Sequence, residues 1–220
     1  LTRRVKIVTI YQCKHGEKIM SFQLIIDNAA DMKISNRRFV AQTQTRSGVV
    51  RSVSQNNSIW RFTISLADGQ PWENWRTYIS GYEQLNRYTT DTVDLSQSGF
   101  SYMFPYQGDE TNIANLRVSV INGELRVQSG VTITSGYLFL VGDLIQLVGG
   151  RVYQVTQPVL WSDTSISTHR APVDEAVGTY DTNIGVLAEW EVICTTMPKW
   201  SFVDHKRVGW DGPFEFQEAM

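Results

Sequence analysis

The candidate catalytic or metal-ligating side chains of this 220-residue sequence are three histidines, two cysteines and a few paired carboxylates. The histidines are His15, His169 and His205, and none has a second metal-ligating residue at the spacing of a metal site. Asp204-His205 is the one adjacent acid–histidine pair, and such pairs are common on protein surfaces. Phosphate-loop, dinucleotide and nucleophile-elbow motifs are missing from the sequence. We therefore predict no catalytic, cofactor-binding or metal-binding residues.

Paired carboxylates are the remaining candidates, because a glycosidase needs only two of them on facing strands. The pairs are Asp109-Glu110, Asp174-Glu175 and Glu189 with Glu191. Adjacent acids in loops usually form solvated surfaces, and the spacing of Glu189 and Glu191 fits the solvent-exposed face of a strand. Glycoside hydrolysis is therefore the third function that we consider, and our main hypothesis is that the chain is not an enzyme.

The two cysteines, Cys13 and Cys194, are too few for a disulfide-stapled secreted domain. We therefore interpret both as thiols. Cys194 ends a strand pattern whose other inward positions are apolar, which favours a buried packing role for its side chain.

The charge balance argues against two classes of partner. The formal net charge is -2 at pH 7 and the pI is ≈ 5.9. A general binder of nucleic acid or of anionic membranes normally carries a basic excess. No apolar run approaches the roughly 20 residues that a membrane-spanning helix needs. We therefore expect neither specific nucleic-acid binding nor membrane association.

The clearest structural signal is a pair of successive β-hairpins in residues 116–156. The first contains Asn122-Gly123, which suits a type I′ turn because both central residues need positive φ. Pairing about that turn predicts the cross-strand pairs Val118/Val127 and Val120/Leu125. The second has Gly149-Gly150 as its predicted two-residue turn, which gives the pairs Leu144/Val155 and Leu147/Val152. Both faces of this second hairpin are apolar, as in a strand pair covered on both sides.

The first hundred residues predict a sheet and a single helix. Apolar residues at 60, 62, 64 and 66 alternate with polar ones, which indicates a half-buried strand. Aromatic and apolar residues then recur at helical spacing after Pro71, and we predict one amphipathic helix over 71–87 that covers an open end of a β-sandwich. Weaker patterns predict strands at 22–26, 39–46, 49–54, 91–95 and 100–106, with a turn at 55–57.

The last third predicts a polar loop at 162–182, with a short strand at 165–169, and then a strand over 186–194. Alternate residues of that late strand share one apolar face: Val186, Ala188, Trp190, Val192 and Cys194. Because this strand resembles the first part of the chain more than the middle, we expect the chain to return there to its first domain.

These patterns predict a mainly β chain, a β-sandwich with one amphipathic helix and an inserted small OB-like β-barrel. Residues 20–106 with 181–199 would form the sandwich, and residues 107–180 would form the barrel. Residues 200–220 would be a C-terminal tail that docks on another subunit or on its own chain. Residues 1–19 would be a leader or translated upstream sequence, with the working protein beginning near Met20.

The order of these elements resembles the distal tail proteins of long-tailed bacteriophages, over residues 37–195. The segments that carry the resemblance are IWRFTISLADGQPW, GDLIQLVGGRVYQVTQPV and VLAEWEVIC. The resemblance implies a homo-oligomeric ring, typically a hexamer, at the tail tip of a virion assembled in the host cytoplasm. Such a ring would join the tail tube protein to the hub, tape measure or fibre proteins, and DNA would pass through its lumen. The family is not enzymatic, so no catalytic residue is carried over.

Two alternatives stay open beside this resemblance. The N-terminal segment and the residues after Met197 have no counterpart in the family pattern, which would also suit a related tube-initiator or fibre adaptor. A carbohydrate-binding β-sandwich is the second function that we consider, because Trp, Tyr and Asn side chains on sandwich loops can stack on sugars and hydrogen-bond to them.

Overall fold

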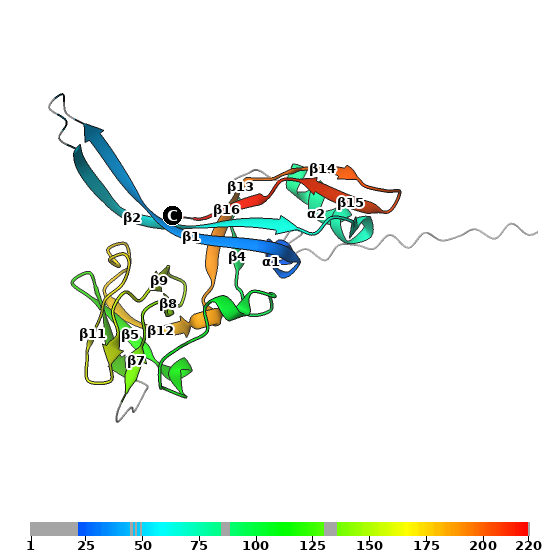
Figure 1. Ribbon diagram of the computed structural model, residues 1–220. Helices are drawn as coiled ribbons and strands as arrows, with labels where there is room; N and C mark the ends of the chain where they lie inside the picture. Colours follow the sequence, from blue (N-terminus) through cyan, green and yellow to red (C-terminus); the bar gives the residue numbers. More distant parts are fainter. Residues whose placement is uncertain are drawn as a thin grey trace, which may run out of the picture.

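The computed structural model describes residues 22–44, 46, 48, 50–84, 89–129 and 136–219 (Figure 1). The predicted leader at 1–19, with Cys13 and His15, lies outside the described residues, and so do residues 85–87 at the end of the predicted helix. The described chain is mainly β, with a sandwich and a small curled barrel, as predicted. Neither of its two α-helices has the length and apolar character needed to cross a bilayer.

Five antiparallel strands form the main sheet of the sandwich. They are β1 (Ala29–Gln44), β2 (Val50–Leu66), β4 (Asp91–Val93), β13 (Trp190–Thr196) and β16 (Phe214–Glu218). Their order across the sheet is β1-β2-β16-β13-β4. Alternate side chains of these strands enter one hydrophobic core, as the strict apolar alternation at 60–66 predicts. The tail is therefore part of this chain's own sandwich, because Phe214 and Phe216 of β16 are buried in that core.

Two helices and a small sheet cover the apolar face of the main sheet. The helices are α1 (Gln23–Asp27) and α2 (Trp72–Gln84), and the small sheet has β3 (Gln70–Pro71), β14 (Lys199–Phe202) and β15 (Arg207–Asp211). The prediction of an amphipathic helix is confirmed, since Trp75 and Ile79 are buried in the sandwich core. The predicted strand at 22–26 is wrong, because this segment forms α1. Its apolar run is too short for periodicity to distinguish a helix from a strand.

The barrel is a six-stranded sheet whose two edges meet. Its strands are β5 (Arg117–Ile121), β6 (Glu124–Ser129), β8 (Leu144–Leu147), β9 (Val152–Gln154), β11 (Ser165–Ile166) and β12 (Gly178–Ile184), in the order β11-β6-β5-β12-β8-β9. Thr156 N donates to Ser167 O and His169 N to Gln154 O, both at 2.9 Å, so the chain after β11 closes against the end of β9. A two-stranded sheet of β7 (Tyr137–Phe139) and β10 (Val159–Leu160) adds to the barrel core.

The register of the first hairpin is confirmed and that of the second is wrong by one residue. Asn122 and Gly123 have φ of 53° and 74°, and Val120 faces Leu125 as predicted. In the second hairpin the observed pairs are Leu144/Gln154, Ile145/Tyr153 and Gln146/Val152. The reason is that Gly150 N donates to Leu147 O at 2.7 Å, so the turn has Val148 and Gly149 at its centre, one residue earlier than the predicted Gly149-Gly150.

This second hairpin, β8–β9, is a wall shared by the two cores. Leu144 and Val152 on one face pack in the sandwich core, whereas Ile145 and Tyr153 on the other face pack in the barrel core. The prediction that both faces are covered is therefore confirmed. The barrel strands continue to Ile184, beyond the predicted end of the insertion at 180, and the chain rejoins the sandwich core at Ala188.

Four local predictions are wrong or shifted. The predicted turn at 55–57 lies inside β2, where a register shift between Arg38 and Phe39 leaves two residues unpaired. The predicted strand at 100–106 contains a 3-10 helix, Ser101–Met103. The polar loop ends earlier than predicted, because β12 begins at Gly178. The late strand begins at Trp190, since the chain first forms a 3-10 turn over Gly185–Leu187 with φ of 63° at Gly185.

Candidate functional site

Two of the predicted carboxylate pairs come together at one pocket of ≈ 220 Å³. Its lining includes Asp174, Glu175, Glu189 and Glu191, and it lies beside the β8–β9 turn at the boundary of sandwich and barrel. Glu189 and Glu191 are exposed, as predicted for the wet side of a strand. Among the described residues no group of histidines, cysteines and carboxylates could hold a metal ion.

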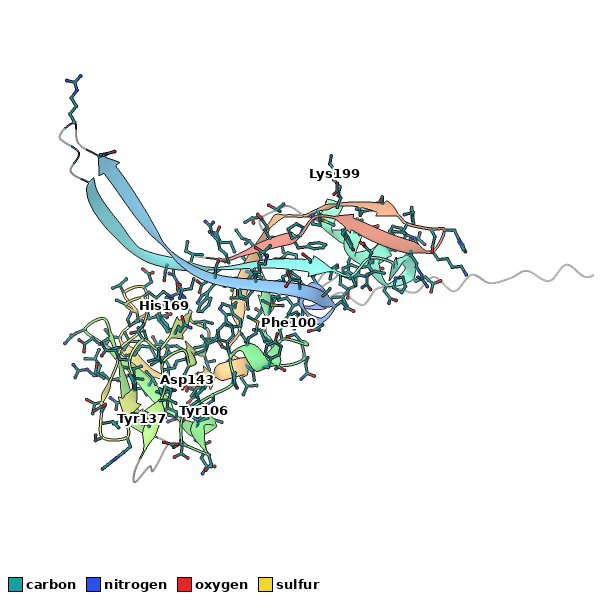
Figure 2. All side chains as sticks on the ribbon, viewed as in Figure 1. Phe100, Tyr106, Tyr137, Asp143, His169 and Lys199 are labelled. Atoms are coloured by element: carbon teal, nitrogen blue, oxygen red, sulfur yellow. The ribbon has the colours of Figure 1, made fainter. Side chains whose placement is uncertain are left out.

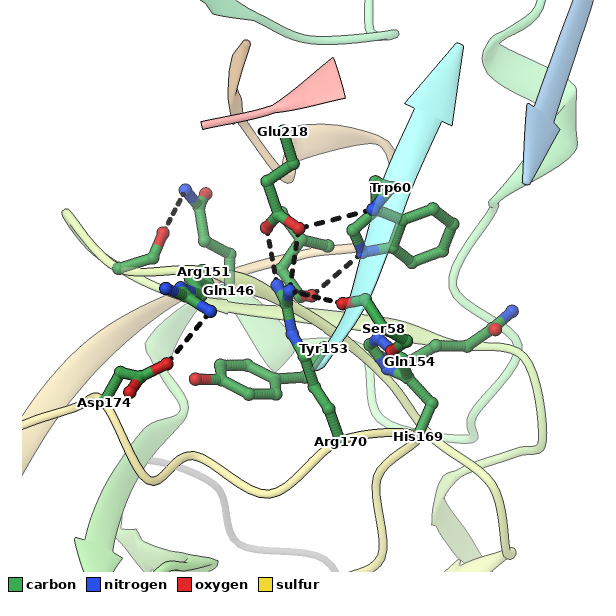
Figure 3. Close-up of polar contacts among 12 residues, drawn as sticks. Ser58, Trp60, Gln146, Arg151, Tyr153, Gln154, His169, Arg170, Asp174 and Glu218 are labelled. Atoms are coloured by element: carbon green, nitrogen blue, oxygen red, sulfur yellow. Dashed lines mark hydrogen bonds and ion pairs between the residues drawn. The ribbon is translucent and has the colours of Figure 1, made fainter. Parts of the chain in front are cut away.

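The carboxylates of the barrel side are held by neighbouring residues. Asp174 forms an ion pair with Arg151 at 3.0 Å, drawn in Figure 3. Glu175 Oε1 accepts hydrogen bonds from Arg151 N at 2.9 Å and from Tyr153 Oη at 3.1 Å. Burial raises the pKa of Tyr153, so its hydroxyl stays protonated and keeps donating to Glu175. These contacts fix the 174–175 loop on the β8–β9 hairpin.

A buried ion pair next to this pocket joins the barrel to the sandwich (Figure 3). Arg170, in the loop after β11, donates from its two terminal guanidinium nitrogens to the two carboxylate oxygens of Glu218 in β16, at 2.7 Å and 2.5 Å. The side chains of both residues are only 4% exposed. We call these two residues with their partners the junction.

Backbone carbonyls of two more strands complete the junction. Arg170 also donates to Ser58 O of β2 at 3.1 Å and to Val152 O of β9 at 2.8 Å. Trp60 Nε1 donates to the same Val152 O at 3.0 Å. Since one guanidinium binds three strands, the sandwich and the barrel have a fixed relative position at this point.

An amide side chain adds a second connection between the two cores. Gln146 of β8 is buried, and its Nε2 donates to Glu189 O at 2.6 Å while its Oε1 accepts from Glu189 N at 2.8 Å. The Glu189 backbone, which leads into β13, is therefore hydrogen-bonded in both directions to a barrel strand. The acidic pocket thus lies on a rigid boundary between the two cores.

The other predicted candidates lie elsewhere and have structural roles. Asp109 Oδ2 accepts from Tyr137 N at 2.7 Å, which supports the turn before β7. Asp204-His205 lies in the exposed turn between β14 and β15, where a hydrogen bond from Lys206 N lowers the pKa of Asp204. His169 is buried, and its Nδ1 accepts from Gln154 N at 2.9 Å. The prediction of a packing role for Cys194 is confirmed, because its side chain is buried in the sandwich core.

Tyr106 is a second tyrosine with a shifted pKa, at the barrel end that Figure 2 labels together with Asp143 and Tyr137. Its hydroxyl donates to Leu138 O at 2.6 Å and accepts from Glu110 N at 3.3 Å. Desolvation by burial raises the pKa of Tyr106 to about 12, and burial also raises the pKa of Asp143. The phenol therefore acts as a neutral hydrogen-bonding bridge between the 106–110 segment and β7.

The Tyr106 shift predicts how stability changes in alkali. A tyrosine of the unfolded chain ionises near pH 10, whereas folded Tyr106 ionises near pH 12, so the folded state holds the extra proton between these values. The free energy of unfolding therefore falls as pH rises from 10 to 12. We expect urea unfolding at pH 9, 10 and 11 to show this fall, and the fall to be shallower in Tyr106→Phe.

Tyr137→Phe is the matched control, because Tyr137 lies nearby but is 42% exposed. We expect this variant to keep the alkaline slope of the unsubstituted protein. An unchanged slope in Tyr106→Phe would contradict the prediction, since the buried phenol would then not be a source of the pH dependence.

A long two-stranded arm is the largest feature that the sequence indicated only in part (Figure 1). The predicted strands at 39–46 and 49–54 fall in β1 and β2, but the patterns did not show that these strands continue unbroken into the main sheet. The strands β1 and β2 have 16 and 17 residues, but β16 pairs with β2 only from Arg61 to Ile64. We define the arm as residues 37–57, the part of this ribbon that extends past the main sheet. Within the described residues, no third strand pairs with either edge of the arm.

The described strands of the arm, residues 37–44 and 50–57, extend about 27 Å at the usual rise per residue of a strand. Figure 1 shows the arm curving away from both cores.

No protein-family model matches the chain, and no curated protein matches it significantly. The arm and the rigid boundary are therefore the two features from which a function can be argued.

Proposed function

We propose that this chain is a structural component of a virion, a ring-forming protein of a phage tail tip that joins the tail tube to the hub and the receptor-binding apparatus. The observation that supports the proposal most is the arm. Over the described residues its two strands leave backbone N–H and C=O groups open along both edges, and natural proteins normally protect such edges. An arm of this length is therefore suited to contact another subunit.

Strand addition is the chemistry that the arm offers. An exposed strand edge binds a partner through main-chain hydrogen bonds, which need no catalytic residue. If the arm of each copy contacts a different surface of the next copy, the contact is heterologous, and a closed cyclic ring results when the rotation closes. The same type of contact can continue to the tail tube.

The rigid boundary supports the second half of the proposal. Arg170, Glu218 and Gln146 hold the barrel against the sandwich through buried contacts. A sandwich in the ring would then present its barrel outward in a fixed direction, which suits an attachment point for hub or fibre proteins. The exposed apolar side chains Tyr137, Leu160 and Trp161 lie on or beside β7 and β10 of that barrel.

Shortening the arm tests the proposal. Replacing residues 40–54 by Asn-Gly connects Phe39 to Gln55, which face each other, through a two-residue hairpin turn. We expect the unmodified protein to form closed rings in negative-stain images, with a mass of about 150 kDa by light scattering for six 25.0 kDa chains. The shortened variant should be a monomer.

The control is the thermal unfolding of the shortened variant. The deleted segment lies beyond the part of β2 that pairs with β16 in the main sheet, so the melting temperature should change little. A monomeric full-length protein at every concentration, or rings that persist without the arm, would contradict the proposal.

A further inference from the structure

The arm differs from the rest of the chain in charge. Residues 37–57 contain four arginines and no aspartate or glutamate: Arg37, Arg38, Arg46 and Arg51. The remaining 199 residues contain 16 basic and 22 acidic residues, a formal net charge of −6 against +4 for the arm. Residues 1–19 are basic as well, with five lysines and arginines against one glutamate, so the acidic excess lies in the other 180 residues, which contain 11 basic and 21 acidic residues. We call these 180 residues the acidic body.

The same molecule also carries an acidic surface that a basic arm could contact. Glu189 and Glu191 are exposed at the boundary pocket, whereas Asp174 and Glu218 are paired with Arg151 and Arg170. Opposite charges on two surfaces of one chain favour one orientation between copies. The arm of one copy is attracted to the acidic surface of the next, whereas arm against arm or acidic surface against acidic surface would be repulsive. A heterologous contact, basic arm to acidic body, uses both surfaces at once.

The open edges of the arm favour a protein over a nucleic acid as its partner. A basic two-stranded ribbon can also enter a DNA groove, where its arginines would bind phosphates. That binding leaves the backbone groups along the two strand edges without a strand partner. A second copy of this chain can satisfy both the charge and the hydrogen-bonding groups.

We infer that the arm docks on the acidic body of a second copy of this chain, and that the four arginines supply the specificity of this contact. This inference rests on the proposed function, because it names the partner surface for the subunit contact of the ring. Its distinctive consequence is that assembly depends on the arm's charge and not only on its length.

The test compares two full-length variants that differ only in arm charge. In one, all four arginines are replaced by lysine, which keeps the charge, and in the other all four are replaced by glutamine. We measure the assembly midpoint by light scattering from 50 to 500 mM NaCl. The unmodified protein and the lysine variant should assemble at low salt and weaken as salt rises. The glutamine variant should assemble about tenfold more weakly or worse at 50 mM NaCl, since exposed pairs each contribute modestly.

The outcomes separate this inference from the proposed function. If the unmodified protein forms rings and the glutamine variant assembles equally well, the charge inference is wrong while the ring proposal stands. If no variant forms rings, the proposed function itself fails. A fluorescent DNA duplex is added in a parallel titration. Binding of the duplex that the glutamine change abolishes, with assembly unaffected, would overturn the inference in favour of nucleic acid.

Discussion

Replacing Glu218 by glutamine should lower the free energy of unfolding by about 3–5 kcal/mol, because it leaves the buried Arg170 guanidinium without a counter-charge. Arg170 and Glu218 are each 4% exposed and joined by two hydrogen bonds. Arg170→Met should cost a similar amount, since it leaves Glu218 buried and removes the Arg170 donors to Ser58 O and Val152 O, of which Val152 O keeps only Trp60 Nε1. Urea unfolding at pH 7 measures both changes.

The double variant shows whether the two side chains act as a pair. Replacing both by methionine removes the charges together, so the loss should be clearly smaller than the sum of the single losses. The matched control is the exposed ion pair of Arg117 and Asp181, whose side chains are 58% and 71% exposed. Arg117→Met should change the free energy of unfolding by about 0–1 kcal/mol. Additive losses at Arg170 and Glu218 would contradict the paired role.

The junction could not be predicted from the sequence because its partners lie far apart in the chain. Arg170 is 48 residues from Glu218 and 112 residues from Ser58. No local pattern distinguishes a charged residue that forms a buried pair from one in a solvated loop, and charged residues are rarely buried. The wrong register predicted for the second hairpin was a further obstacle to predicting the junction. It placed Leu147 opposite Val152, where the structure has Gln146.

The two hairpins show when a turn sequence determines register. Asn-Gly strongly favours a type I′ turn, because both residues accept positive φ, and the observed register followed from it. Gly-Gly accepts many backbone conformations, so it does not fix which two residues stand at the centre of the turn, and the observed turn is centred on Val148 and Gly149. The apolar alternation still placed both strands of the second hairpin in the core, which is why the fold class could be predicted and the pairing could not.

The sequence predicts the two strands of the arm at 39–46 and 49–54, but not their continuation into the main sheet, because the arm lacks a continuous apolar face. Residues 37–57 are rich in Arg, Gln, Ser, Thr and Asn, so strict alternation is visible only in the part of β2 that enters the sandwich core. A strand pair with two polar faces gives a weak periodic signal. The polar residues at 55–57 therefore predict a turn instead of the middle of a strand. The carboxylate pairs were found from the sequence, but their meeting at one pocket depends on contacts between the two cores.

Removing the indole of Trp190 should have the second large effect on stability. Trp190 is 1% exposed and lies at the centre of an aromatic cluster, with ring centroids 5.4 Å from Phe62, 5.9 Å from Trp60 and 6.5 Å from Phe104. Trp190→Ala removes these contacts and leaves a cavity beside the junction. We expect a loss of about 3–5 kcal/mol in the free energy of unfolding, measured by urea titration.

Trp190→Phe distinguishes loss of volume from loss of the indole N–H. Trp190 Nε1 has no hydrogen-bond partner among the described residues, so phenylalanine removes an unsatisfied donor as well as part of the ring. We therefore expect a loss of only about 1–2 kcal/mol for this variant. Trp161→Ala is the control, because Trp161 is 51% exposed and its removal should cost within about 0.5 kcal/mol. Equal losses for Trp190→Ala and Trp161→Ala would show that the aromatic cluster does not hold the sandwich together, because a central ring would then contribute no more than a surface ring.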